Sequence, residues 1–190
     1  MKQIKTIFLF AFVVSFANAS FAQMNDMNNN TVIVGGAAMF PSKNIIENAV
    51  NSKDHTTLVA AVKAAGLVET LQSTGPFTVF APTNNAFGML PEGTVANLLK
   101  PENKALLTTV LTYHVVAGKL NVADLAKLIK EGKGIATLHT VAGQELKIWM
   151  KGKKIMVTDQ AGGIAFVTIK DVNQSNGVIH VVDHVLLPKM

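Results

Sequence analysis

The segment FTVFAPTNNAF at residues 77–87 combines a short apolar run with the signals that end it. Residues 77–80 are β-favouring and largely apolar, which is typical of a strand buried on both faces. Pro82 has no amide hydrogen to donate and therefore ends the ladder. The hydroxyl of Thr83 can accept a hydrogen bond from the free amides of a following helical turn. The segment therefore predicts a central strand that leads directly into a short helix.

Apolar residues at helical spacing dominate the sequence around this strand. Between residues 58 and 65 they form one face, with Asp54 before them as the expected N-cap and Gly66 after them as a stop. Pro101 suits the first position of a later helix. The predicted helices cover residues 45–50, 55–65, 67–72, 84–90, 91–99, 101–111 and 122–131.

The pattern changes to period two after Gly134, with turn signals such as Asn176-Gly177 between the runs. A helical first half and a β-rich second half, tied together by the strand at 77–80, predict an α+β domain. Tyr113-His114-Val115-Val116 predicts one further strand. The other expected strands lie near residues 135–140, 145–150, 154–159, 164–171 and 178–187.

A second apolar run, NGVIHVVDHVLLP at residues 176–188, supplies the surface on which the 77–80 strand can pack. Fully burying each of its aliphatic side chains contributes on the order of 1.5–3 kcal/mol. The blocks at 77–87 and 176–188 resemble the two signature blocks of the fasciclin domain. Between them, Tyr113-His114 looks like the Tyr-His motif of that family.

The resemblance covers Asn44 to Pro188, and the chain is similar to the bacterial secreted single-domain type. It implies a fasciclin-like α+β fold, a β-sandwich or wedge with helices from the N-terminal half packed around it. The residues themselves predict a signal peptide at 1–22 and a flexible asparagine-rich leader at 23–40, and the fasciclin-like domain is expected at 41–190.

The expected signal peptide has a positive start at Lys2, an apolar run at residues 7–17 and a small-residue cleavage site ending at Ala19 or Ala22. The apolar run is shorter than the roughly 20 residues that a membrane span needs, and no later segment is long enough. The sequence therefore predicts a secreted or periplasmic protein that does not span a membrane.

Composition excludes several classes of function. The chain has no cysteine, so thiol catalysis, disulfides and thiolate metal sites are excluded. Its 17 basic residues are all lysine, and loss of Lys2 and Lys5 with the expected signal peptide lowers the net charge from +5 to about +3. A weak net charge without arginine argues against a nucleic-acid partner. One cluster contains Lys147, Lys151, Lys153 and Lys154, and it is either a solvated hairpin tip or a contact for an anionic surface.

Four residues are candidates for partner binding. Tyr113 and His114 either fix the structure or, as the resemblance implies, belong to a region that meets cell-surface partners in animal members. Asp171 and Val172 are similar in position to an Asp-Ile pair that is associated with integrin contact in animal members.

No metal, cofactor or catalytic group is expected. His180 and His184 lie four positions apart, about 13 Å along a strand, which is too far for both to hold one ion. The sequence has no nucleophile elbow, zinc-protease motif or phosphate-binding loop, so we expect a protein that is not an enzyme.

The leading hypothesis is an adhesion module that binds a cell-surface or matrix protein or a polysaccharide, with self-association as one route to bridging two surfaces. The alternative is a periplasmic binder of a small apolar ligand, which the apolar content and 8 methionines suggest.

Overall fold

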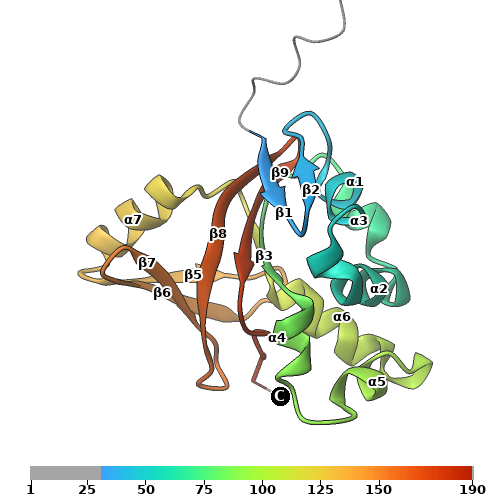
Figure 1. Cartoon of the computed structure of the whole chain (residues 1–190). Coiled ribbons are helices and arrows are strands. Elements are labelled where there is room, and N and C mark those ends of the chain that lie inside the picture. The colour runs from blue at the N-terminus through green and yellow to red at the C-terminus, as the bar shows by residue number, and fades with distance from the viewer. Residues whose placement is uncertain (1–30, 190) are drawn as a thin grey trace, which may run out of the picture.

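The computed structural model describes residues 31–189 of the chain (Figure 1). The predicted signal peptide and the first residues of the predicted leader lie outside this range. At the centre, β3 (Phe77–Pro82) pairs in parallel with β9 (Gly177–Val182), and β4 (Val115–Ala117) pairs antiparallel on the other side of β3. The two signature blocks are therefore neighbours in the sheet, as the family resemblance implies.

The remaining strands extend the sheet from β9 through consecutive antiparallel pairs. They are β8 (Ile164–Gln174), β7 (Lys154–Thr158), β6 (Glu145–Lys151) and β5 (Ile135–His139), and the full order is β4-β3-β9-β8-β7-β6-β5. A bridge between Val116 and Thr140 brings the two ends of the sheet together. The sheet is thus a nearly closed wedge, and the α+β prediction is confirmed.

Most helices cover one side of this sheet, whereas α7 (Val122–Glu131) covers the other end (Figure 1). The first side holds α1 (Ile45–Ala49), η2 (Lys53–His55), α2 (Thr56–Ala65), α3 (Val68–Gln72), α4 (Asn84–Gly88), α5 (Thr94–Leu98), η3 (Pro101–Asn103) and α6 (Lys104–Tyr113). One apolar core lies between these helices and the β3–β9 pair, and a second fills the wedge beneath Leu125 and Ile129 of α7.

Local capping follows the sequence in one case and departs from it in another. Thr83 accepts a hydrogen bond from the Ala86 amide at 3.3 Å and begins α4, as predicted. The expected cap of α2 by Asp54 is wrong, because Lys53 to His55 form a 3-10 turn. Instead, the side-chain oxygen of Asn84 accepts from the Thr57 amide at 3.0 Å, so a distant segment caps this helix.

Two expected boundaries differ from the structure. Residues 32–39 form a hairpin of β1 (Val32–Val34) and β2 (Ala37–Met39), and Val34 and Met39 are each only 3% exposed. Ordered structure therefore begins before Pro41, because the hairpin contributes to the first core. The last strand ends at Val182, and the chain continues to Leu187 without strand pairing.

Candidate functional site

His114 lies at the end of α6 and is not on a strand, contrary to the sequence prediction. It is 2% exposed. Its Nδ1 donates to the Val110 carbonyl at 2.7 Å, and its Nε2 accepts from the Leu186 amide at 2.9 Å. Burial lowers the pKa of His114 to about 4, and the nearby Val110 carbonyl and Asp159 only partly oppose this. A neutral imidazole therefore holds the C-terminal segment against α6.

Tyr113 is fully buried within the second core. Its hydroxyl donates to the Glu145 carbonyl at 2.8 Å and accepts from the Gln160 amide at 3.0 Å. Burial raises the pKa of Tyr113. The Tyr-His pair thus joins α6 to β6, to the loop after β7 and to the C-terminal segment, and neither side chain presents a surface to a partner.

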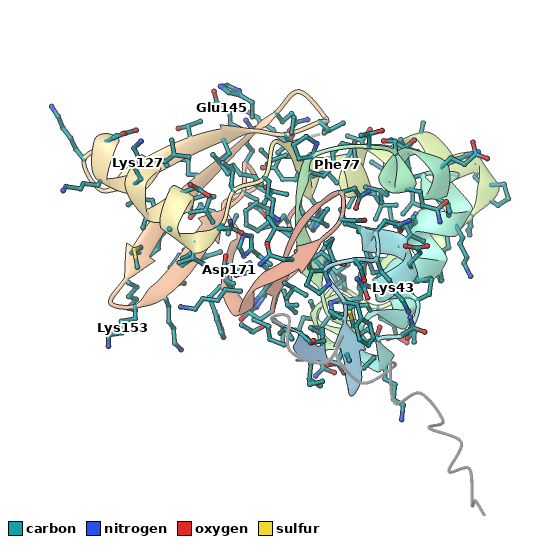
Figure 2. The ribbon with its side chains drawn as sticks, turned by 90° about the horizontal axis from the view of Figure 1, so that it is seen from above. Lys43, Phe77, Lys127, Glu145, Lys153 and Asp171 are labelled. Carbon is teal, nitrogen blue, oxygen red and sulfur yellow. The ribbon has the colours of Figure 1, made fainter. Side chains whose placement is uncertain are left out.

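Asp171 and Val172 occupy an irregular part of β8 and do not lie beside the Tyr-His pair. Asp171 has a left-handed φ of 55° within a register shift of the strand, and its carboxylate accepts from the Val122 amide at 2.7 Å. It is half-buried, between the wedge and the helices (Figure 2). Val172 is 1% exposed in the first core. Of the four predicted residues, only Asp171 is accessible at all.

The two late histidines are separated by their environments. His180 is buried, its Nε2 donates to the Leu120 carbonyl at 2.8 Å, and burial lowers its pKa. His184 lies beyond β9, is exposed and pairs with Asp183 at 3.0 Å. Residues 31–189 contain no group of three potential metal ligands and no helix long and apolar enough to cross a membrane.

An exposed row crosses the outward face of the wedge. Ile135, Trp149, Met156 and Phe166 stand directly opposite one another on β5, β6, β7 and β8, and we call them the outer row. Ile135 is 53% exposed and the other three are half-buried. The alternate residues of each strand point inward to the second core. The outer row therefore lies on the solvent side of the sheet and is formed by four large apolar side chains.

Three exposed lysines, Lys147, Lys151 and Lys154, share the face with the outer row, and we call them the flanking lysines. The ammonium of Lys154 lies 4.7 Å from the centre of the Phe166 ring, a cation–π contact. The indole of Trp149 donates to the Thr158 hydroxyl at 3.0 Å. The flanking lysines form no ion pair with a carboxylate of residues 31–189.

Charge is distributed unevenly over the fold. Residues 31–114, which hold most helices, contain five lysines and five carboxylates. Residues 115–174, which form β4, α7 and β5 to β8, contain nine lysines and five carboxylates. Figure 2 places Lys127 and Lys153 at the end of the molecule that lies away from Lys43. Residues 115–174 therefore carry the net positive charge of the described part of the chain.

A mainly apolar cavity of about 80 Å³ lies within the first core, between the early helices and β3. His55 lines it and is 3% exposed. Its Nδ1 is bonded to the Ser52 hydroxyl at 2.9 Å, whereas its Nε2, near the Ala81 backbone, has no hydrogen bond of normal geometry. Burial lowers the pKa of His55.

Sequence reasoning found the lysines of the β6–β7 hairpin but missed the outer row and the cavity. Period-two alternation assigns Trp149 and Met156 to a face of their own strands. It does not give the register that aligns them, because register depends on turns and on the shared core.

Comparisons with known proteins agree on one family. Residues 53–188 match the family model described as Fasciclin domain. The chain is 44% identical over 182 residues to protein sll1483 of Synechocystis sp., covering 96% of this chain and 93% of that protein. It is 37% identical over 145 residues to immunogenic protein MPB70 of Mycobacterium bovis, covering 74% and 66%. Human periostin is 33% identical over 144 residues, which are 75% of this chain and 16% of periostin.

A solved structure supports the same fold. The FAS1 domain pair of the insect cell adhesion molecule Fasciclin I superposes with a TM-score of 0.69 at 18% identity. The match covers 76% of this chain and 51% of that one.

Proposed function

The chain belongs to the fasciclin-domain family, and from this premise we propose that it is a secreted or periplasmic binding protein that attaches to a surface or matrix. The partner is a protein or a polysaccharide, and the role is binding rather than catalysis. Membership also supports adhesion by analogy, since one protein of the same fold is a cell adhesion molecule.

The observation that carries this proposal is the exposed wedge face. On this face, half-buried aromatic side chains lie beside lysines that form no ion pair with a carboxylate of residues 31–189. Such a surface on a soluble domain is typical of an interaction site. The buried Tyr113 and His114 instead support binding indirectly, because they hold β6 and the C-terminal segment against α6.

The test is retention of the mature protein on cell envelopes, exopolysaccharide and extracellular matrix. We expect saturable retention on at least one of these materials. A chain that carries the same tag and has been heat-unfolded controls for non-specific adsorption. If the folded protein is retained on none of them, the adhesion proposal is wrong.

The cavity beside His55 favours a second candidate function, the binding of a small apolar ligand. An apolar cavity of about 80 Å³ beside a ring nitrogen without a hydrogen bond has room for a molecule of only a few heavy atoms, one of them polar. Native mass spectrometry of protein purified from its own host tests it. A mass equal to that of the ligand-free chain would remove this candidate and leave the surface proposal untouched.

A further inference from the structure

We propose that the outer row and the flanking lysines bind an acidic polysaccharide, a chain of sugar rings that carry carboxylate or sulfate groups. This inference rests on the surface-binding function proposed above. It adds the site on the molecule and the chemical class of the partner.

The outer row has the shape that a linear polymer requires. Its four side chains are aligned across β5, β6, β7 and β8 by direct pairing. With strands about 4.8 Å apart, the row extends for about 14 Å, the length of a short oligosaccharide. A chain of sugars can therefore lie across the strands and contact every member of the row.

The row is also held in place before any partner arrives. The Thr158 hydroxyl restrains the indole of Trp149 at 3.0 Å, and Lys154 lies over the Phe166 ring. Both rings are half-buried, so little side-chain freedom is lost when a partner covers them. Such preorganisation lowers the entropic cost of binding.

The chemistry of the face matches an acidic sugar. One side of a pyranose ring presents mainly C–H bonds, and these can pack on the electron-rich face of the Trp149 indole. The ammonium groups of Lys147, Lys151 and Lys154 each have three donors for carboxylate, sulfate or hydroxyl oxygens. Since they pair with no carboxylate of residues 31–189, an anionic partner can bind them without breaking an ion pair.

Charge complementarity favours this partner over other anions. The β6–β7 hairpin that supplies Trp149 and Met156 carries four lysines, at 147, 151, 153 and 154, against one carboxylate, Glu145. Nucleic acid fits less well, because the chain has no arginine for bidentate phosphate contacts. A bilayer also fits less well, because Trp149 and Phe166 are half-buried on the sheet rather than fully exposed for insertion.

The chain contains its own reporter, because Trp149 is the only tryptophan. Full-length mature protein is titrated with polygalacturonate while Trp149 emission and its quenching by acrylamide are followed. We expect a change in emission, protection from acrylamide and a loss of both effects at about 0.5 M salt, where charge interactions are screened. Neutral dextran should produce neither effect.

Variants locate the site. Lys147→Gln/Lys151→Gln/Lys154→Gln should weaken binding to polygalacturonate roughly tenfold, since several screened charge contacts are lost together. The control Lys43→Gln/Lys100→Gln/Lys104→Gln removes the same charge from the helical half, including Lys43 above the Phe40 ring, and should change affinity less than about twofold. Trp149→Thr, assayed on immobilised polymer, tests the stacking contact. Circular dichroism shows whether each variant is folded.

Each outcome has a clear meaning. Equal weakening by both triple variants would reduce the effect to general charge and overturn the inference. Binding to anionic lipid vesicles without binding to polygalacturonate would replace the partner with a membrane. If envelopes or matrix retain the protein while polygalacturonate leaves Trp149 unchanged, this inference fails and the proposed function stands. If polygalacturonate binds as expected but no envelope or matrix retains the protein, the site stands and the adhesive role fails.

Discussion

The backbone amide of Leu186 donates to Nε2 of His114 at 2.9 Å, across 72 positions of sequence. Because an amide can only donate, this nitrogen must be unprotonated, and the other ring nitrogen carries the hydrogen that reaches Val110. Protonation of the ring would place two N–H groups against each other. The residue that marks the Tyr-His motif is therefore a neutral clamp on the C-terminal segment.

This clamp predicts a dependence of stability on pH. The pKa of His114 is about 4 in the folded chain, against 6.5 for an unperturbed histidine, so the unfolded chain binds more protons between these values. The contribution of His114 is complete above about pH 6.5 and is lost as the pH falls toward 4. From the 1.36 kcal/mol per pKa unit, we expect a loss of about 2–3 kcal/mol in the free energy of unfolding. Urea denaturation at pH 7.5 and 4.5 measures it.

The matched comparison uses His114→Gln and His139→Gln. Glutamine cannot titrate, so the first variant should be less stable at pH 7.5 but less sensitive to acid. His139→Gln replaces an exposed ring and controls for the substitution itself. The lowered pKa values of His55 and His180 act in the same direction and account for acid sensitivity that remains. An unaltered pH slope in His114→Gln would contradict the assignment.

Removal of the side-chain amide of Asn176 should cause a large loss of stability. Its side chain accepts from the Ile45 amide at 3.0 Å and donates to the carbonyls of Leu71 and Ser73 at 2.8 and 2.9 Å. Asn176→Ala leaves the Ile45 amide and the Leu71 and Ser73 carbonyls without these hydrogen bonds. Because buried polar groups without partners are costly, the free energy of unfolding should fall by about 2–4 kcal/mol. Asn51→Ala, which removes one exposed bond to Glu47, should cost less than about 1 kcal/mol by the same urea assay. Similar costs for the two variants would refute this role.

The sequence predicted those features that depend on nearby residues and missed those that depend on distant ones. The strands expected at 77–80 and near 178–187 follow from local apolar runs, whereas their pairing is what the family resemblance implies. Tyr113-His114 was expected in a strand, yet Tyr113 is the last residue of α6 and His114 its C-cap, and Tyr113 packs in the second core through contacts distant in sequence. The cap of α2 by Asn84 and the alignment of the outer row likewise depend on long-range register, which local patterns do not encode.

The position of Gly177 has no room for a side chain. A Cβ there would press on the Phe77 carbonyl oxygen and lie 3.0 Å from the Phe77 nitrogen, in the parallel β3–β9 pair. Gly177→Ala should therefore displace a central strand and lower the free energy of unfolding by about 2 kcal/mol or more, as overpacking of a core does. Thermal or urea unfolding measures the loss.

Gly88→Ala is the matched control for this substitution. Gly88 is exposed at the end of α4, and a Cβ there meets nothing within 4 Å. Alanine should be neutral or stabilise by up to about 1 kcal/mol, because it restricts the unfolded chain. Equal effects at the two positions would mean that β3 and β9 separate easily to make room.

The β1–β2 hairpin predicts that residues before Pro41 contribute to the stability of the domain. Met39 is 3% exposed and packs in the first core, whereas Ile33 on the same hairpin is 60% exposed. Met39→Ala should therefore cost about 2–5 kcal/mol through lost burial and the cavity that remains. Ile33→Ala should change stability by no more than about 0.5 kcal/mol, as most surface substitutions do. Urea denaturation compares the two, and a negligible effect of Met39→Ala would mean that the hairpin is a dispensable leader, so that the domain begins at Pro41 after all.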